Sequence, residues 1–210
     1  MKNQVLKLYG INAAGIKSKT ESFNNVLTNL KPHIWMVQET KLKPHERINC
    51  EALNDYQVFY LYRHDSQGGG IALGITKKLE STFVTEGNDD TEVMVALVTV
   101  GKIPIRVIVG YGVQENAHKE KKEAFWDFIE NEVVEAEAKN QGVIIQMDGN
   151  LHAGNNLVKN DPQSTESEWE NFYAVFTAKQ NTCSSKWIRY LSRSNYKTAS
   201  IGIKNRKSRS

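Results

Sequence analysis

Five polar side chains follow apolar segments of this sequence, at places where predicted strands end. Glu39 and Asp148 are carboxylates, and Asn12 and Asn150 are amides. Tyr111 ends a further apolar segment in the same way. Oxygen ligands without a Cys/His cluster suit Mg²⁺, with Mn²⁺ as an alternative, rather than zinc. A hard cation held by one or two carboxylates leaves room for a phosphate and waters, which is the equipment of phosphoester hydrolysis.

The first of these residues belong to a predicted strand, helix and strand. Residues 4–11 are mostly apolar and end at Asn12, and the short apolar run 34–38 ends at Glu39. Between them, Ser18 and Glu21 have the spacing of a helix capping box, and apolar residues follow at helical intervals. We expect a proline, residue 32, to close this helix.

The middle of the chain has the composition of β-strands. Residues 56–63 are aromatic and β-branched, and a Gly-rich turn separates them from the apolar run 71–75, so the two predict antiparallel strands. Residues 92–100 are apolar on both faces, and a turn at Gly101 leads into 103–110. Together these segments predict a large, mixed and mostly covered system of sheets.

A second predicted strand, helix and strand repeats the order of the first. The strand 103–110 ends at Tyr111, a charged helix follows over about 117–139, and the apolar strand 143–147 ends at Asp148. Ligands bind beyond the carboxyl ends of parallel strands in such sheets. We therefore expect a site between the two units, where their strand exits meet.

Ordered motifs in this chain resemble the endonuclease/exonuclease/phosphatase superfamily. They are Asn12-Ala13-Ala14-Gly15-Ile16, Gln38-Glu39-Thr40, the strand exit at Tyr111, and Asp148-Gly149-Asn150. Within that superfamily, Gly68–Gly70 and Lys17-Ser18-Lys19 look most like the apurinic-type endonuclease domain of non-LTR retrotransposons. The resemblance covers roughly residues 4–155.

The resemblance implies a four-layer α/β sandwich of two mixed sheets flanked by helices, incomplete at its C-terminus. It implies metal-dependent hydrolysis of the DNA phosphodiester backbone, with Glu39 as the metal-binding residue and Asn12 near metal and phosphate. Tyr111 would reach the scissile phosphate. Asp148 would orient or activate the attacking water, and Asn150 would help to hold the phosphate.

The sequence departs from the superfamily at several points. Met147-Asp148-Gly149-Asn150 stands where Gly-Asp-Phe-Asn is usual, which keeps the two functional positions. We expect His152 to be an ordinary surface or structural residue. The chain has no Ser-Asp-His run, no aspartate after Asp161 and no histidine after His152. Since these groups stabilise phosphate charge and activate water, the resemblance implies weak or absent activity.

Charge divides the chain into two regions. Residues 1–162, the expected superfamily-like domain, carry 18 basic and 21 acidic side chains, whereas residues 163–210 carry nine basic and three acidic ones. We expect 163–210 to be a basic tail that is disordered or poorly packed. Two alternatives remain open: an out-of-frame reading, and an arm that binds nucleic acid or directs nuclear import through residues 204–209.

Composition is that of a globular protein with a core. The chain has 210 residues, 40% hydrophobic, a formal net charge of +3 and two cysteines. Neither a membrane span nor a signal peptide is evident, so we expect an intracellular protein, nuclear or cytoplasmic, without a membrane partner. Oligomeric state stays open. The alternative functions are a phosphatase or phospholipid phosphodiesterase, and a non-catalytic nucleic-acid-binding remnant or pseudogene product.

Overall fold

The computed structural model describes residues 4–63, 68–87, 91–113, 117–148, 172–177 and 197–203. Its elements, in chain order, are β1 (Gln4–Asn12), η1 (Lys17–Lys19), α1 (Thr20–Leu30), β2 (Ile34–Gln38), η2 (Glu51–Asp55), β3 (Tyr56–Leu61), β4 (Ile71–Thr76), β5 (Glu80–Glu86), β6 (Val93–Val100), β7 (Ile103–Tyr111), α2 (Lys119–Ala138), β8 (Gly142–Asp148), β9 (Phe172–Thr177) and β10 (Lys197–Ile203).

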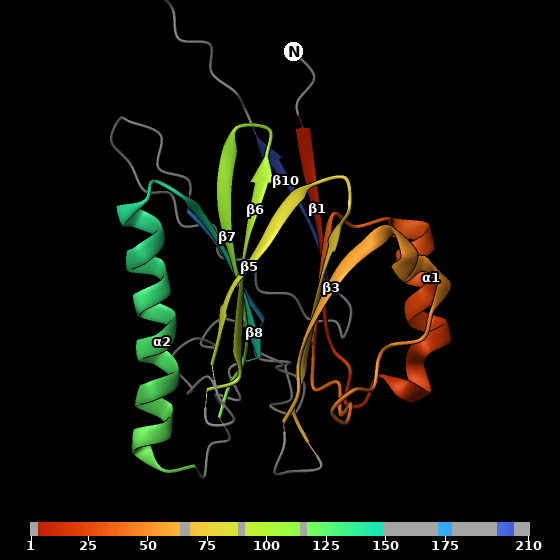
Figure 1. The fold of residues 1–210 in the computed structure, drawn as a ribbon, viewed down its shortest axis with the longest axis horizontal. Helices are drawn as coiled ribbons and strands as arrows, with labels where there is room; N and C mark the ends of the chain where they lie inside the picture. The colour runs from red at the N-terminus through yellow and green to blue at the C-terminus, as the bar shows by residue number, and fades with distance from the viewer. Residues whose placement is uncertain are drawn as a thin grey trace, which may run out of the picture.

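Two sheets pack face to face, with α1 outside one and α2 outside the other (Figure 1). The strand orders are β10-β1-β2-β4-β3 and β5-β6-β7-β8-β9. Each sheet is mixed, because it contains one parallel pair with antiparallel neighbours on both sides. The expected four-layer α/β sandwich of two mixed sheets is therefore confirmed.

The parallel pairs are the two predicted strand, helix and strand units. In the first, β1 pairs with β2 and Asn12 lies opposite Gln38. In the second, β7 pairs with β8 and Tyr111 lies opposite Asp148. In each pair the two strands end at the same level, so the polar residues at their exits are brought to one edge of each sheet.

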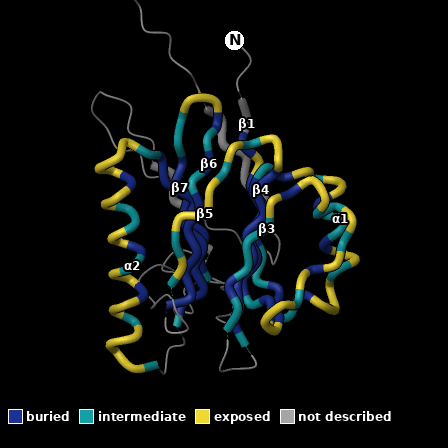
Figure 2. Tube along the Cα trace, viewed as in Figure 1, coloured by how far each residue is buried: buried dark blue, intermediate teal, exposed yellow. Residues whose placement is uncertain are grey.

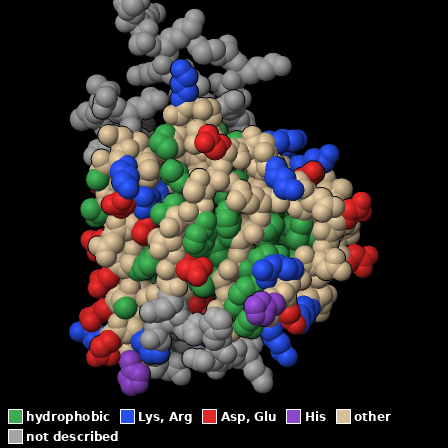
Figure 3. Space-filling model, in the orientation of Figure 1, with side chains coloured by type: hydrophobic (Ala, Val, Ile, Leu, Met, Phe, Trp, Pro, Cys, Tyr) green, Lys and Arg blue, Asp and Glu red, His purple; other side chains and the backbone are tan. Residues whose placement is uncertain are grey.

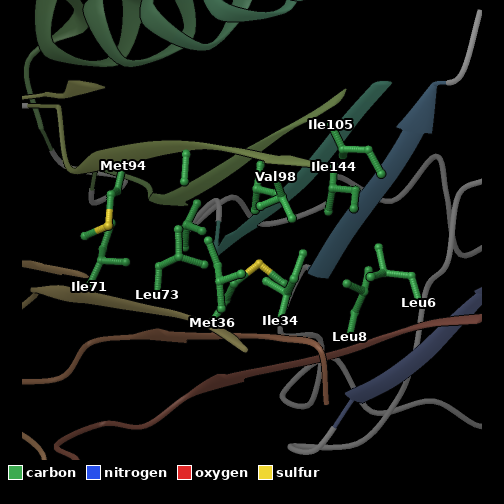
Figure 4. Close-up of a cluster of buried hydrophobic side chains, with 14 of the residues drawn as sticks. Leu6, Leu8, Ile34, Met36, Ile71, Leu73, Met94, Val98, Ile105 and Ile144 are labelled. Carbon is green, nitrogen blue, oxygen red and sulfur yellow. The ribbon is translucent and has the colours of Figure 1, made fainter. Parts of the chain in front are cut away.

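Apolar side chains from both sheets fill the space between them (Figure 4). One sheet contributes buried residues of β1, β2 and β4, and the other contributes residues of β6, β7 and β8; they include Leu8, Met36, Leu73, Met94, Val98, Ile105 and Ile144. β2 and β4 are buried along their whole length, because a second cluster covers their outer face (Figure 2). This two-sided burial explains why their sequences lack polar alternation.

Helix α1 packs on that outer face through aromatic contacts. The Phe23 ring meets the Trp35 indole edge-on at 5.1 Å, and Trp35 meets Tyr56 at 6.1 Å. Phe23, Leu27 and Trp35 are all buried. Edge-to-face aromatic pairs add about 0.5–1.5 kcal/mol each to the burial of their area. These contacts fix α1 against β2, the strand that directly precedes Glu39.

The expected capping box of α1 is wrong. Ser18 lies inside the 3-10 turn η1, and the helix begins at Thr20 with no side-chain cap at Lys19. Thr20 Oγ1 instead donates to the Lys17 carbonyl at 3.0 Å. The helix ends as expected, since Lys31 adopts a left-handed conformation just before the proline and donates its N–H to the Leu27 carbonyl.

Helix α2 buries one face and exposes an acidic one. Phe125, Ile129 and Ala136 are buried against the second sheet, as the helical spacing predicts. The helix carries seven acidic and three basic residues, and Figure 3 shows acidic side chains gathered along its side of the molecule. In the part of the chain that the structure describes, no helix is both long and apolar enough to cross a membrane.

Beneath α2, the buried Arg106 of β7 forms an ion pair with Glu132. Its Nε also donates to Gln141 Oε1 at 3.0 Å. These two partners offset the cost of burying the guanidinium. The pair ties α2 to the sheet.

An unexpected strand, β5, lies at the edge of the second sheet. Its residues are mostly exposed, and the Phe83 ring lies 5.4 Å from Phe59 of β3 in the other sheet. Ser81 Oγ donates to Gln57 Oε1 at 3.0 Å beside this contact. The edge strands β3 and β5 therefore close one side of the sandwich.

Two strands lie within the expected tail. The backbone of β9 pairs antiparallel with β8, and that of β10 pairs antiparallel with β1. Both therefore extend sheets formed by the earlier part of the chain. The boundary at residue 162 and the out-of-frame origin of residues 163–210 stay predictions.

We expect protonation of His33 at acidic pH to lower the free energy of unfolding. Its Nδ1 accepts the Lys7 N–H at 2.9 Å. Burial, followed by the charges of Lys7 and Lys78, lowers the pKa of His33 from 6.5. As pH falls, the unfolded chain therefore binds a proton at His33 before the folded protein does. The stabilisation that neutral His33 contributes is complete above the pKa of His33 in the unfolded chain, and it is lost as pH falls through the pKa in the folded protein.

Urea unfolding at about pH 7.5 and about pH 5.5 tests this, with His33→Asn as the variant that keeps an acceptor but does not titrate. The free energy of unfolding should fall less between the two pH values in the variant than in the wild type. An identical fall in both proteins would show that His33 contributes nothing to the pH dependence.

Candidate functional site

The exits of the two parallel pairs meet across the gap between the sheets. Asn12, the last residue of β1, donates its Nδ2–H to Asp148 Oδ2 at 2.6 Å. Asp148 is the last residue of β8, so this hydrogen bond joins the two sheets. Both side chains are half-buried. A hydrogen bond to a carboxylate is among the stronger ones, and partial burial strengthens it further.

Both ends of the Asn12 amide are used. Its Oδ1 accepts the Ala14 N–H at 2.9 Å, which turns the chain away from the strand. Nδ2 therefore points to Asp148. The amide thus orients the carboxylate, and a substitution by aspartate would bring two negative oxygens together.

Glu39 lies directly beyond β2 in a strained backbone conformation. Its φ is +53°, and Ala14 and Lys41 nearby also have positive φ values, +46° and +52°. Such conformations cost non-glycine residues on the order of 1–3 kcal/mol each and persist only where neighbouring bonds impose them. Here the Glu39 carbonyl accepts the Gly15 N–H at 2.8 Å. The Glu39 side chain is 19% exposed, and one carboxylate oxygen lies 2.9 Å from Lys41 Nζ.

Tyr111 ends β7 with its ring in the core between the sheets. Its N–H donates to the Glu92 carbonyl at 2.9 Å. The next residue, Gly112, donates to the Asp148 carbonyl at 2.6 Å. Main-chain bonds therefore hold Tyr111 beside Asp148 at the end of the second parallel pair.

The structure brings Asn12 and Asp148 into contact and places Glu39 and Tyr111 at the exits of their neighbouring strands. Asn150 lies outside the described residues, as does His152. The roles assigned to all of these residues stay predictions.

A pair of buried glutamines, which sequence reasoning missed, lies beneath the site. Gln146 Nε2 donates to Gln38 Oε1 at 3.2 Å across the two sheets, and each residue is 1% exposed. Gln38 Nε2 and Gln146 Oε1 have no hydrogen-bond partner among the described residues. A Cβ on Gly10 would overlap the Gln146 amide. The sequence does contain a signal for this pair: Gln38 and Gln146 each lie near the end of an apolar segment, where a polar side chain needs a buried hydrogen-bond partner.

The donor set fits a hard divalent cation. Glu39 and Asp148 supply carboxylates at neighbouring strand exits. Among the residues that the structure describes, no group of three or more His, Cys, Asp or Glu side chains is arranged to hold a metal. One or two carboxylates completed by water and phosphate are the usual environment of Mg²⁺, so the residues present suit that ion better than zinc.

Basic side chains lie on the loops that follow β1 and β2. We call residues 13–19 and 39–50 the basic loops; their exposed cationic residues are Lys17, Lys19, Lys41, Lys43 and Arg47. Glu46 joins the two loops, because it forms an ion pair with Lys17 Nζ at 2.6 Å and accepts the Lys43 N–H at 2.8 Å. The Lys17 hydrogen bond and then that of Lys43 lower the pKa of Glu46.

Two tyrosines of the first sheet's edge anchor the second loop. Tyr60 and Tyr62 stack at 5.9 Å, and the Arg47 guanidinium lies 4.8 Å from the centre of the Tyr60 ring. The Tyr62 hydroxyl donates to the Glu46 carbonyl at 2.8 Å, and Tyr60 Oη accepts the Ile48 N–H at 3.2 Å. Burial raises the pKa of Tyr60. This loop therefore has a defined shape beside Glu39.

Known proteins resemble this chain in fold but not closely in sequence. No protein-family model matches it, and no curated protein does. Among solved structures, TDP2 from C. elegans aligns with a TM-score of 0.51 and 14% identity, over 70% of this chain and 48% of that one. The 3'-5' exonuclease NExo from Neisseria meningitidis aligns with a TM-score of 0.54 and 20% identity, over 70% and 58%.

Two further structures with this fold contain DNA. One is described as the 3' phosphatase NExo from Neisseria bound to a product DNA hairpin, with a TM-score of 0.55 and 18% identity over 71% of this chain and 60% of that one. The other is D. rerio TDP2 with a single-strand DNA product, with a TM-score of 0.52 and 16% identity over 70% and 62%. The chain thus shares its fold with TDP2 and with NExo, a protein described as a 3'-5' exonuclease and 3' phosphatase, and spans between about half and two-thirds of their length.

Gly10 of β1 lies against the Gln146 side chain of β8, so we expect the effects of substitutions at these two positions on the free energy of unfolding to depend on each other. Gly10→Ala should lower the free energy of unfolding by about 1–3 kcal/mol, because the new methyl group overlaps the Gln146 amide. In a Gln146→Ala background the same change should cost much less. Urea denaturation of the wild type, both single variants and the double variant measures the coupling, and strictly additive effects would contradict this packing.

Proposed function

We propose that this protein is a magnesium-dependent phosphodiesterase that cleaves DNA, of the endonuclease type found in non-LTR retrotransposons. The hydrogen bond from Asn12 to Asp148 carries the proposal, because it unites the exits of both parallel pairs in one oxygen-rich site. The shared fold with DNA-processing phosphodiesterases and phosphatases supports it.

In this proposal each residue acts where its strand ends. Asp148 would accept a hydrogen bond from the attacking water and so orient it, while Asn12 holds the Asp148 carboxylate in its orientation. Glu39 and Asp148 would hold the cation, which when bound neutralises phosphate charge and stabilises the leaving oxygen. Tyr111 and Asn150 would contact the phosphate. Lys41, paired with Glu39, adds positive charge at the same place.

The basic loops favour a polyanionic substrate over a small phosphomonoester. Lys17, Lys43 and Arg47 are exposed on these loops, where Lys17 is paired with Glu46. Several exposed cations suit the phosphates of a nucleic acid, whose binding releases counterions. The DNA bound to the similar Neisseria and D. rerio proteins is consistent with this choice.

We further propose that the activity is weak. The sequence has no Ser-Asp-His run, and His152 is its last histidine. In this resemblance, those missing groups would share the phosphate charge with Glu39 and Asp148. Loss of one such group commonly costs about 10²–10³ in rate. The alternative is a protein that binds DNA without cleaving it, and a nicking assay separates the two.

Cleavage should depend on Mg²⁺ and on both carboxylates. We expect Glu39→Gln and Asp148→Asn each to lower the rate of nicking of supercoiled plasmid and of an abasic duplex by about 10²-fold or more, because each removes charge that faces the reacting phosphate. Chelation with EDTA should abolish nicking. Asp127→Asn, on the exposed face of α2, is the matched control and should keep wild-type activity.

Nicking that survives both site substitutions would exclude this site as its source. A folded wild-type protein that binds the same plasmid but never nicks it would exclude the enzyme and favour the non-catalytic binder.

Binding to DNA should depend on the basic loops and on salt. Lys17→Gln combined with Lys43→Gln should weaken binding to a duplex and lower the slope of log K against log[salt] by about 0.9 for each phosphate that is no longer neutralised. Lys78→Gln, an exposed change in the turn between β4 and β5, is the control. Fluorescence anisotropy at several salt concentrations measures both quantities. An unchanged slope in the double variant would show that the phosphates bind elsewhere.

A further inference from the structure

A buried ion pair lies at the same end of the sandwich as the candidate site. Glu92 directly precedes β6, and its Oε1 lies 2.5 Å from Arg63 Nε just beyond β3. The Glu92 side chain is 2% exposed and that of Arg63 is 21% exposed. Carboxylates are almost never buried so completely unless they are paired. Since the two residues come from different sheets, the pair is a further polar link between the sheets.

The glycine segment 68–70 lies against the Glu92 carboxylate. The Gly70 N–H donates to Glu92 Oε1 at 3.4 Å. A Cβ at Gly69 would overlap the same oxygen and would lie 3.0 Å from Arg63 Nε. Gly69 and Gly70 have φ values of +73° and +83°, which glycine adopts without strain. This segment therefore has glycines because the backbone must both turn and touch the carboxylate.

The glycine segment in turn holds the chain around Glu39. The Gly70 carbonyl accepts the Thr40 N–H at 3.0 Å, and the Gly69 carbonyl accepts the Lys41 N–H at 3.0 Å. A side chain on Gly70 would crowd Thr40 Oγ1 at 2.7 Å. Two main-chain bonds thus fix the residues that follow Glu39, including the lysine paired with its carboxylate.

On its other side, Glu92 holds Tyr111. The Glu92 carbonyl accepts the Tyr111 N–H at 2.9 Å. One residue therefore contacts Tyr111 through its main chain and, through its carboxylate and the glycine segment, the turn that carries Glu39. Glu39 belongs to the first sheet and Tyr111 to the second, so their separation depends on this connection.

We propose that Glu92, paired with Arg63, is a positioning residue that sets the place of Glu39 relative to Tyr111 through the Gly69–Gly70 segment. This inference rests on the proposed function, in which Glu39 and Tyr111 act on one phosphate. Glu92 itself touches no reacting atom. Its carboxylate contacts Arg63 and the Gly70 N–H, and the Gly69 and Gly70 carbonyls accept the N–H groups of Lys41 and Thr40, so its effect on Glu39 passes through the main chain of the glycine segment.

The charges of Arg63 and Glu92 affect the orientation of the neighbouring glycine peptides as well as the stability of the fold. An apolar pair of similar volume would pack at the same place without fixing the orientation of the glycine peptides. The Arg63 guanidinium and the Gly70 N–H both contact Glu92 Oε1, so this oxygen holds the glycine segment against the residue that precedes β6.

Amide hydrogen exchange, followed by NMR, tests the positioning independently of catalysis. In Glu92→Gln and in Arg63→Met, the amides of Thr40, Lys41 and Tyr111 should exchange about tenfold faster or more, because the bonds that protect them loosen. Arg63→Lys, which keeps the charge at a partly exposed position, should restore part of the protection and serves if either other variant fails to fold.

Glu132→Gln is the matched control, since it breaks the buried pair of Arg106 on the far side of the second sheet. It should leave the exchange of Thr40 and Lys41, relative to the strand interiors, as in the wild type. If the wild type nicks DNA, Glu92→Gln should lower kcat by about 10²-fold with KM little changed, as displacement of a catalytic group does. Glu132→Gln should not.

Unchanged exchange at Thr40, Lys41 and Tyr111 in both Glu92→Gln and Arg63→Met would overturn the positioning role, whatever the activity of the wild type. Equal loosening in Glu132→Gln would also overturn it, because the effect would then be one of general stability. Faster exchange confined to the Glu92 and Arg63 variants supports the role, and if the wild type nonetheless lacks nicking, the proposed function is what fails.

Discussion

Two parallel strand pairs face each other across the sandwich, and the candidate site depends on their ending at the same level. Apolar contacts between sheets tolerate small slides, because dispersion forces have little directionality. Hydrogen bonds do not. The bonds from Asn12 to Asp148 and from Gln146 to Gln38 fix the slide between β1–β2 and β7–β8, and Gly10 permits the approach. The strained turn at Glu39 persists only against so rigid a frame.

Several polar links between the sheets lie at the end of the sandwich that holds the strand exits, among them the bonds from Asn12 to Asp148 and from Gln146 to Gln38. Towards the middle, the sheets meet through aliphatic side chains such as Met36, Leu73 and Val107. Burial of these apolar side chains stabilises the fold, and this stabilisation offsets the cost of removing water from the polar groups at the interface. A buried glutamine with one amide atom that has no partner among the described residues is tolerable beside so large an apolar core.

The strands that surround the core could be predicted because their apolar runs are long and their turns are rich in glycine. β5 was missed because an exposed edge strand, Glu80–Glu86, has few apolar residues to reveal it. The capping box at Ser18 was a local pattern that the 3-10 turn overrode. Four candidate residues could be placed from strand ends alone. The pairing of Glu92 with Arg63 could not, because nothing in either segment identifies a partner 29 residues away.

The acidic face of α2 gives the molecule an uneven distribution of surface charge. The carboxylates of α2 give one outer layer a negative surface, whereas the basic loops carry exposed lysine and arginine side chains. A polyanion drawn to the strand exits is repelled from the first side and attracted to the second, over a Debye length of about 8 Å in physiological salt. The two helical layers therefore do more than cover sheets. They give the molecule an electrostatic polarity, with carboxylates along α2 and the cations of the basic loops beside the other helical layer.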